Sequence, residues 1–315
     1  MPFPRRQMIT GVLATLATAA SGGRSPAQVA DRPFLLYHQA ELDTAYDQQA
    51  WAPNQSAIVA RYAAESAQVR RLLPPRTEHY GPSAAETLDI FAPSVTGRLP
   101  IHVFIHGGAW RGLSKDDASA PAPTFVELGA IYIALNFANL PAVRLPDMVE
   151  QCRAALRWIA ANAARFGGNA ERITLSGHSS GAHLAAVMLT TDWAAGGLPA
   201  DLIKHGLLMS GIYDLHPVML SSRRTYVKLS PDEVTALSPI RHLDRITCPV
   251  HVAWGDLESP EFKRQNMLMA EVLAGMGRLA GRSVLFNHNH FEVPEQLNRP
   301  DSQLGRVALK AMGLG

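Results

Sequence analysis

RITLSGHSSGAHL, residues 172–184, places a glycine-serine turn between an apolar strand and a helix rich in alanine and leucine. Its centre, Gly177-His178-Ser179-Ser180-Gly181, has the pattern G-x-S-x-G. A nucleophile on so sharp a strand-to-helix turn needs small neighbours, because a side chain at 177 or 181 would collide with the adjoining backbone. The helix start behind Ser179 also directs amide N–H groups and partial positive charge at its oxygen. The pattern predicts a nucleophilic Ser179, and the alternative is a plain glycine turn in which Ser179 caps the helix.

Apolar strands alternate with helices on both sides of this turn. Strands are expected at residues 87–93, 99–108, 130–137, 172–178, 205–212, 249–255 and 282–287. Helices are expected at residues 147–165, 181–190, about 260–276 and about 297–312. Such alternation predicts an α/β fold with a mostly parallel central sheet and helices on both faces.

Two segments stand outside this alternation. Residues 34–75 are polar and helical in pattern, and we expect them to form an N-terminal arm or cap. Residues 213–243 interrupt the alternation, and the capping-box pattern at 230–233 (SPDE) predicts a helix within them. We interpret 213–243 as an insert that forms a pocket wall or lid on a single catalytic domain, residues 31–315.

The overall composition is that of a globular protein. The chain has 315 residues, of which 47% are hydrophobic and 18% charged, and its formal net charge is +2. There is no basic block, so nucleic acid is not an expected partner. The two cysteines, Cys152 and Cys248, fit no metal-binding spacing. We expect two free buried thiols rather than a disulfide.

Residues 1–30 have the layout of an export signal. An Arg5-Arg6 pair precedes an apolar run from Met8 to Ala20, as in a twin-arginine signal. That run is shorter than the about 20 apolar residues that span a bilayer, so no stable membrane anchor is expected. The prediction is export to the periplasm, and the alternative is a frayed helix on a cytoplasmic protein.

The end of the strongest strand predicts an oxyanion-binding loop. Acyl transfer needs preorganised amide donors, and the Gly-Gly turn in IHGGAW (105–110) lets backbone N–H groups face inward. Gly108 and Ala109 are the expected donors, with the Ser180 amide as the third, and Gly107 is a further candidate. Trp110 is expected to line the substrate pocket, and the alternative is simple packing.

Two histidines follow the last strand, in NHNHFE (287–292). Either could act as the general base toward Ser179. His290 is favoured over His288 because it lies further into the loop. His-x-His-x-Glu could also suggest a metal site, but that would leave Ser179 unexplained, so neither metal nor cofactor is expected.

WGDLESPEF (254–262) supplies three candidates for the acid that orients the histidine. Ser259-Pro260 is typical of a helix N-cap followed by proline in the first turn, and Glu261 then stabilises that helix start. Asp256 and Glu258 stay open on the residues alone, because Asp is the usual triad acid and Glu is an accepted one.

The order of these motifs resembles the arylformamidase (kynurenine formamidase) branch of the α/β-hydrolases, close to the hormone-sensitive-lipase-like esterases. The matching stretches are residues 106–110, 177–184, 258–265 and 290–291, and the resemblance covers about residues 40–312. It implies an α/β-hydrolase fold, and its register favours Glu258 as the acid, with Asp256 as the runner-up. His178 and Phe291 are expected beside Trp110 in the substrate pocket.

The resemblance also implies an activity. It predicts a serine hydrolase that cleaves a small acyl group, formyl to short-chain, from an ester or aryl formamide. A general carboxylesterase is the main alternative, and a non-catalytic binding protein of the same fold is the second. The expected partner is therefore a small-molecule ester or formamide.

Overall fold

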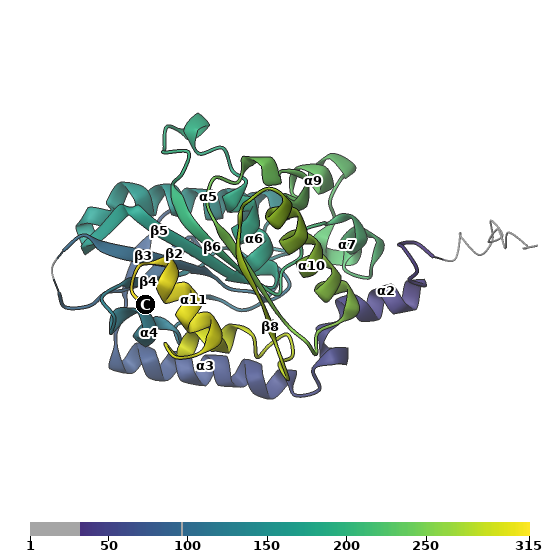
Figure 1. Ribbon diagram of the computed structural model, residues 1–315, viewed down its shortest axis with the longest axis horizontal. Helices are drawn as coiled ribbons and strands as arrows, with labels where there is room; N and C mark the ends of the chain where they lie inside the picture. The colour runs from purple at the N-terminus through teal and green to yellow at the C-terminus, as the bar shows by residue number, and fades with distance from the viewer. Residues whose placement is uncertain (1–31, 96) are drawn as a thin grey trace, which may run out of the picture.

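The computed structural model describes residues 32–95 and 97–315, which build an eight-stranded sheet between two layers of helices (Figure 1). The strand order is β1-β2-β4-β3-β5-β6-β7-β8. Both neighbours of β2 run antiparallel to it, and every other neighbouring pair is parallel. The strands are β1 (Arg76–His79), β2 (Thr87–Phe91), β3 (Leu99–Ile105), β4 (Ile131–Leu135), β5 (Gly168–His178), β6 (Ile203–Met209), β7 (Val250–Gly255) and β8 (Leu279–Leu285). The expected α/β class with a mostly parallel sheet is confirmed.

The helices cover both faces of the sheet and the edge where the parallel strands end. The α-helices are α2 (Gln39–Tyr46), α3 (Gln55–Leu72), α4 (Ala122–Val126), α5 (Leu145–Asn162), α6 (Ser180–Leu189), α7 (His216–Leu220), α8 (Arg224–Val227), α9 (Pro231–Ala236), α10 (Pro260–Gly275) and α11 (Gln303–Ala311). Short 3₁₀ helices are η1 (Gln48–Trp51), η2 (Lys115–Asp117), η3 (Ala163–Phe166), η4 (Ala194–Gly196), η5 (Pro239–Arg241), η6 (Leu243–Arg245) and η7 (Pro294–Asn298).

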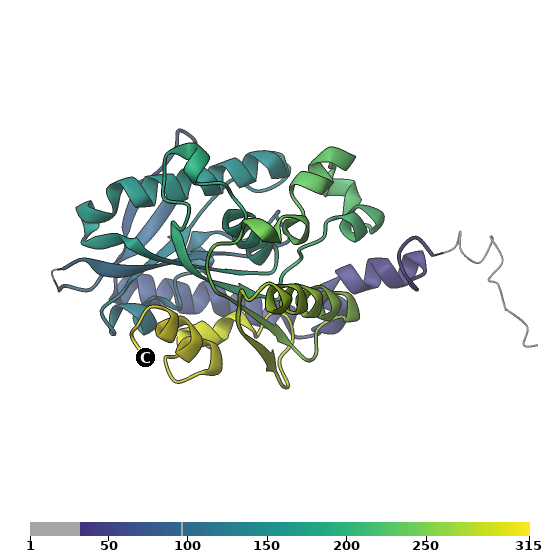
Figure 2. The same cartoon turned by 45° about the horizontal axis from the view of Figure 1, so that its top comes forward.

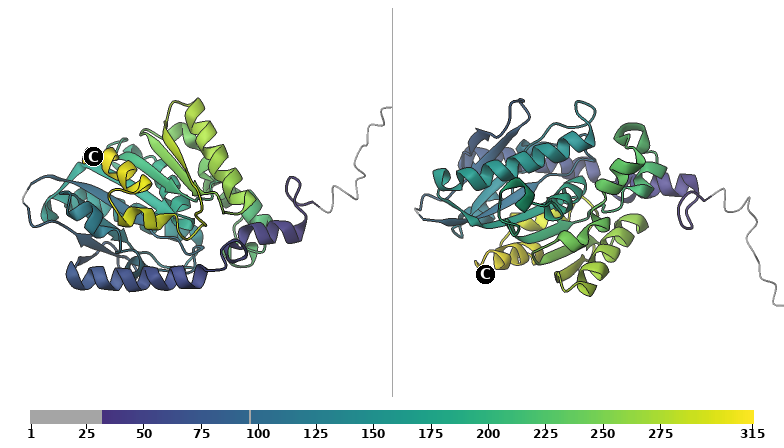
Figure 3. Two further views of the ribbon diagram at one scale, coloured as in Figure 1. Left: turned by 60° about the horizontal axis from the view of Figure 1, so that its bottom comes forward. Right: turned by 90° about the horizontal axis from the view of Figure 1, so that it is seen from above.

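The apolar core is divided by the sheet into two clusters. One face packs against α5, α6 and α10, with side chains such as Leu156, Leu184 and Phe262 fully buried. The other face packs against α4 and α11, where Phe125 and Leu304 are buried, and the long helix α3 runs along the same side (Figures 2 and 3). All ten residues of α6 are buried, which explains why that segment lacks a polar face.

Two elements differ from the sequence expectation. Strand β1 is a polar edge strand, Arg-Thr-Glu-His, so it carries no apolar alternation that could have revealed it. The single helix expected at about 297–312 is instead η7 followed by α11. Pro300 disfavours a helical conformation in the residue before it. Ser302 then starts α11 anew, with its hydroxyl accepting the N–H of Gly305 (2.9 Å).

The glycine stop expected after the helix at 147–165 is present. Gly167 adopts a left-handed conformation (φ 78°) and ends η3, which continues α5. Both cysteines are free and buried, as expected. No helix within residues 32–95 and 97–315 is long and apolar enough to cross a membrane. The predicted export signal lies outside the described residues and stays a prediction.

The arm, residues 34–75, is tied to the start of α10 by a buried carboxylate. Glu261 is fully buried, and its Oε1 accepts the hydroxyl of Tyr46 in α2 (3.0 Å). Arg264 binds both oxygens of Glu261 at 2.7 Å, and Gln265 bridges Glu261 and Tyr46. Glu261 therefore has two roles. It stabilises the start of α10 through the helix dipole, as the sequence predicted, and it also anchors the arm.

The insert, residues 213–243, contains the short α-helices α7, α8 and α9 and the 3₁₀ helix η5. The capping box expected at its third helix is confirmed. Ser230 Oγ accepts the N–H of Glu233 (3.2 Å), and the Glu233 carboxylate accepts the N–H of Ser230 (2.9 Å). The insert also meets the arm, since the N–H of Ser222 donates to Asp43 (2.6 Å). Arm and insert therefore face each other across the same end of the sheet.

Glu261→Gln should loosen the arm. The amide would leave the Arg264 guanidinium without a bidentate partner beside the buried Tyr46 hydroxyl, and breaking such a pair costs on the order of 2 kcal/mol when one partner is partly exposed. Urea unfolding should show that loss. Glu271→Gln on the same helix removes an exposed ion pair with Arg282, and should change the unfolding free energy by less than about 0.5 kcal/mol. Equal effects of the two changes would contradict the anchoring role.

Candidate active site

Ser179 occupies a strained turn between β5 and α6. Its backbone is at φ 57° and ψ −123°, a conformation that non-glycine residues rarely adopt. A Cβ on Gly177 would lie 2.2 Å from the carbonyl oxygen of Gly181, and a Cβ on Gly181 would lie 2.2 Å from that of Ile105. The structure thus bears out the expectation that both positions must be glycine.

Ser179, His290 and Glu258 form a buried hydrogen-bonded chain. The Ser179 Oγ lies 2.9 Å from Nε2 of His290, and Nδ1 of His290 lies 3.0 Å from Oε2 of Glu258. The three residues are 5%, 2% and 1% exposed. They follow β5, β8 and β7, whose carboxyl ends meet at one edge of the sheet. In this geometry Ser179 donates to Nε2, and the Nδ1–H of His290 donates to the carboxylate.

The second oxygen of Glu258 is held by two donors. Its Oε1 accepts the hydroxyl of Ser210 (2.5 Å) and the N–H of Gly255 (2.7 Å). Asp256, the runner-up, is not part of the chain. Its Oδ1 is buried without a hydrogen-bond partner, and its backbone carbonyl accepts the ammonium of Lys263 (3.0 Å). Between the two candidates, only Glu258 reaches His290.

Three backbone N–H groups are candidates for the oxyanion site: Gly108 and Ala109 line the same cavity as Ser179, and Ser180 follows Ser179 in the chain. Gly108, Ala109 and Trp110 have positive φ angles of 106°, 55° and 60°, so the loop after β3 curls tightly. Glycine is required at 108, where a Cβ would lie 2.0 Å from the carbonyl oxygen of Gly112. Within the described part of the chain, the N–H groups of Gly108, Ala109 and Ser180 donate to no protein acceptor. They are open donors of the kind that an oxyanion needs.

Gly107 packs directly behind the nucleophile. A Cβ there would lie 2.9 Å from the carbonyl oxygen of His178 and 3.1 Å from Cβ of Ser179. The absence of a side chain at 107 therefore allows the oxyanion loop to approach the Ser179 turn. The sequence did not decide whether Gly107 is also a donor, and its packing accounts for the glycine without that role.

Trp110 does not line the pocket, contrary to the expectation. It is 1% exposed, its indole N–H donates to Nδ1 of His183 (3.2 Å), and its backbone N–H donates to Oγ of Ser180 (3.1 Å). The positive φ at Trp110 turns the side chain into the core. Its role is to hold the oxyanion loop against α6, which was the packing alternative.

The other residues of the histidine loop, residues 287–292, make contacts that differ from one residue to the next. His288 contacts the carbonyl of Phe286 and the side chain of Gln296, away from Ser179. Glu292 accepts the N–H of Asn289. The structure therefore does not bring the His-x-His-x-Glu run together around one point. Phe291 packs edge-on against His290, with ring centroids 5.1 Å apart.

His178 supports His290 from behind. Its Nε2 lies 2.8 Å from the backbone carbonyl oxygen of His290, so Nε2 carries the donated proton. Burial holds the pKa of His178 well below its usual value. This ring is therefore neutral, and it fixes the backbone of the triad histidine while it also lines the cavity.

Ser179 opens into a cavity of about 680 Å³. The arm and the insert supply much of its lining, with the oxyanion loop and the histidine loop closing the rest. Lining residues include Tyr46, Tyr62, Ala109, Arg111, Leu113, His178, Arg223, Tyr226, His290 and Phe291. A hollow of about 40 Å³ adjoins it, lined by Gly107 and sharing Tyr62, Leu113 and His178.

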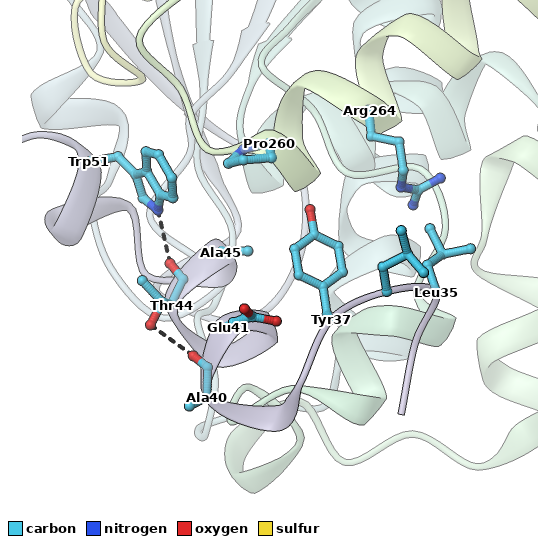
Figure 4. A pocket seen from close by; sticks show the side chains of 10 residues that line it. Leu35, Tyr37, Ala40, Glu41, Thr44, Ala45, Trp51, Pro260 and Arg264 are labelled. Carbon is cyan, nitrogen blue, oxygen red and sulfur yellow. Dashed lines mark hydrogen bonds between the residues drawn. The ribbon is translucent and has the colours of Figure 1, made fainter. Parts of the chain in front are cut away.

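A second large cavity, of about 730 Å³, lies on the outer side of α2 (Figure 4). Leu35, Tyr37, Trp51, Pro260 and Arg264 line it, and it contains none of the triad residues. Helix α2 separates it from the Ser179 cavity, because Thr44 and Ala45 face the outer cavity while Tyr46 and Asp47 face the inner one. We therefore place the candidate active site in the inner cavity.

A nucleophile turn after β5, an acid after β7 and a histidine after β8 on this sheet define an α/β-hydrolase. The BD-FAE family model matches residues 88–196. The chain is 30% identical to the kynurenine formamidase of Danio rerio over 286 residues, which cover 87% of this chain and 96% of that protein. It is 31% identical to that of Salmo salar over 241 residues, covering 74% and 80%. The chain belongs to the kynurenine formamidase family of α/β-hydrolases.

Solved structures agree with this fold. A protein of Silicibacter sp. TM1040, provisionally called a thioesterase, superposes with a TM-score of 0.74 at 29% identity, covering 85% of this chain and 98% of that one. An esterase of Pyrobaculum calidifontis superposes with a TM-score of 0.65 at 17% identity, covering 85% and 97%, which shows the fold alone. By homology the chain is a hydrolase of the esterase or kynurenine formamidase type.

Several residues of the site were missed from the sequence. Ser210 could have been found, since it follows β6 between β5 and β7, whose ends carry Ser179 and Glu258. Tyr46 and Arg223 could not, because their contact joins the arm and the insert, which are far apart in the chain.

The stability of the protein should fall in mild acid partly through His183. This buried ring donates from Nε2 to the carbonyl of Leu237 (2.8 Å), and burial lowers its pKa to about 4. As the pH falls, His183 takes up a proton near pH 6.5 in the unfolded chain but stays neutral to about pH 4 in the folded chain. The contribution of His183 to the free energy of unfolding is therefore fully present above pH 6.5 and is lost as the pH falls toward 4. His183→Gln keeps a donor and an acceptor but cannot titrate. Its unfolding free energy should fall less steeply between pH 6.5 and 5, by up to about 1.4 kcal/mol per pH unit. Parallel curves for the two proteins would rule this out.

Proposed function

We propose that the protein is a serine hydrolase that removes a small acyl group, formyl to short-chain, from an aryl formamide or an ester. The observation that carries this proposal is the buried chain Ser179–His290–Glu258 beside three open N–H groups. Membership of the kynurenine formamidase family supports a formamide as one substrate.

The geometry suits a two-step acyl transfer. His290 takes the proton of Ser179 as the serine oxygen attacks the carbonyl carbon, and Glu258 stabilises the imidazolium that forms. The carbonyl oxygen becomes an oxyanion, which the N–H groups of Gly108, Ala109 and Ser180 would bind. His290 then gives its proton to the leaving nitrogen or oxygen. Water, deprotonated by the same ring, attacks the acyl-enzyme and frees Ser179.

The cavity at Ser179 supports a sizeable leaving group. It has a volume of about 680 Å³, and Ser179, His290, Gly108 and Ala109 line it. A small acyl group on Ser179 would occupy little of this volume, so most of the cavity is left for the leaving group. The limit to a small acyl group is supported by membership of the kynurenine formamidase family.

A general carboxylesterase is the second candidate. Esterase LipQ of Mycobacterium tuberculosis is 29% identical over 238 residues, covering 69% of this chain and 54% of that protein. The two candidates share one mechanism and differ in the bond that is cleaved. Aryl formamides and aryl esters with the same leaving skeleton separate them, because a formamidase must also protonate a poor nitrogen leaving group.

Ser179→Ala should abolish turnover. The expected loss in kcat/KM toward p-nitrophenyl acetate is about 10³-fold or more, because no acyl-enzyme can form. For the wild type, kcat/KM should decline along p-nitrophenyl acetate, butyrate and octanoate, because the proposed substrates carry only a formyl to short-chain acyl group. Equal rates for the wild type and Ser179→Ala would leave only a binding role for the fold.

Glu258→Gln should lower kcat by about 10³-fold or more with little change in KM. The amide would present a donor to Nδ1 of His290 and favour the wrong tautomer. Asp256→Asn is the matched control and should stay within about threefold of the wild type, because His290 pairs with Glu258 and Asp256 is not among the residues that line the Ser179 cavity. Thermal unfolding shows whether both variants are folded. A large loss in Asp256→Asn with an active Glu258→Gln would reverse the assignment of the acid.

A further inference from the structure

Asn266 is a fully buried residue of α10 whose side-chain amide reaches into the loop after β6. Its Oδ1 accepts the N–H of Gly211 (3.1 Å) and the hydroxyl of Tyr213 (3.0 Å). Its Nδ2 donates to the backbone carbonyls of Gly211 (3.1 Å) and Phe262 (2.8 Å). Both donors and both acceptor positions of the amide are therefore used. Among side chains of this size, asparagine alone offers two donors and two acceptors.

Two of these hydrogen bonds hold both polar groups of a single residue, Gly211. Asn266 accepts its N–H and donates to its carbonyl, so the position and the direction of this backbone residue are both fixed. A Cβ on Gly211 would lie 2.3 Å from the hydroxyl oxygen of Tyr213, so glycine also allows that hydroxyl to approach. The loop after β6 is therefore held against α10, although the two residues are 55 positions apart in the chain.

The residue before Gly211 is Ser210, whose hydroxyl binds the acid of the triad. Ser210 is fully buried, and its Oγ donates to Oε1 of Glu258 (2.5 Å). Its backbone has a φ of 55°, in the left-handed region that favours glycine. The backbone alone would therefore be served better by glycine, and what serine adds at this position is the hydroxyl.

The acid and its hydroxyl donor are both positioned by α10. Glu258 lies two residues before the start of the helix at Pro260, so the chain itself places it. Ser210 is placed by Asn266, through the adjoining residue of the loop. A glutamate has one more rotatable bond than an aspartate, so more freedom must be removed to fix its carboxylate. The Ser210 hydroxyl and the Gly255 N–H (2.7 Å) supply that restraint on Oε1.

We propose that Asn266 is a positioning residue for the triad acid and that it acts through Gly211 and Ser210. By fixing the loop after β6, it keeps the Ser210 hydroxyl on Oε1 of Glu258, which leaves Oε2 facing Nδ1 of His290 (3.0 Å). An acid that is already fixed needs no reorganisation when the imidazolium forms. The inference rests on the proposed hydrolase function, because it gives a residue outside the cavity a part in the same reaction.

Two substitutions of Ser210 separate catalysis from stability. Ser210→Gly and Ser210→Ala should both lower kcat toward p-nitrophenyl acetate by about ten- to hundredfold, the factor that corresponds to a hydrogen bond to a charged group. KM should stay within about twofold, because Ser210 is not among the residues that line the Ser179 cavity. Ser210→Gly should have the higher Tm of the two, because its backbone suits glycine. A wild-type kcat in either variant would overturn the inference.

Asn266→Ser tests the residue itself. A serine hydroxyl in a helix can still donate to the carbonyl four residues earlier, that of Phe262, but it is too short to hold Gly211. The expected result is a kcat lowered about tenfold with KM unchanged. Met269→Ala on the same helix removes a buried core side chain without touching the loop, so it should lower Tm and leave kcat within about twofold. Equal losses of kcat in the two variants would show a merely structural role.

A double variant and a crystal structure complete the test. Ser210→Gly/Asn266→Ser should be no slower than Ser210→Gly alone, because the hydroxyl through which Asn266 acts is already gone. Losses that multiply would contradict the inference. The crystal structure of Asn266→Ser should show the Ser210 Oγ moved beyond hydrogen-bond distance of Oε1 of Glu258. This measurement needs no turnover, so it decides the positioning role even if the wild type cleaves no ester and the proposed function fails. A retained hydrogen bond would overturn the role.

Discussion

The approach of three backbone segments around Ser179 is the constraint on which the site depends. Gly177 and Gly181 allow β5 and α6 to meet at the turn, and Gly181 presses against the carbonyls at the end of β3. This contact brings the oxyanion loop beside the nucleophile. Ser179 within this turn has a positive φ, a conformation that costs about 1–3 kcal/mol and persists only where the surrounding structure fixes it.

Hydrogen bonds fix the other residues of the site relative to that turn. His290 is fixed twice, since Glu258 holds its ring and His178 holds its backbone. Glu258 in turn is fixed by Ser210, at the end of β6. Each partner comes from the end of a different parallel strand, so the alignment of the triad is a property of the sheet. Fixing both oxygens of the acid in this way limits reorganisation when the imidazolium forms.

The sequence was sufficient to predict those structural features that depend on residues close together in the chain. The strand-turn-helix at Ser179, the caps at Ser230 and Ser259, and the glycine stop at Gly167 each follow from residues close together in the chain. The α/β class followed from the alternation of strands and helices. The choice of His290 and Glu258 needed the loop register as well, because neighbouring residues of the same chemistry were available.

Features that depend on the third dimension were not accessible. Trp110 was expected in the pocket, but the positive φ of the oxyanion loop reverses its direction, and no residue type signals that reversal. Glu261 looked like a helix-dipole residue because its partner Tyr46 lies 215 positions away. Arg223 gave no signal, because its contact with the backbone carbonyl of Tyr46 forms only when the insert packs against the arm.

The segment from Gly255 to Phe262 performs several tasks that cannot be separated along the chain. Gly255 ends β7, Glu258 holds His290, Ser259 caps α10, and Glu261 anchors the arm. An insertion or deletion of one residue between the two glutamates would misplace one of them. A change of substrate range is therefore easier to accommodate in the arm and the insert. There a cavity-lining side chain can be exchanged without shifting the register of the acid, so the parts of the site that tolerate exchange are physically distinct from the segment that holds the triad acid.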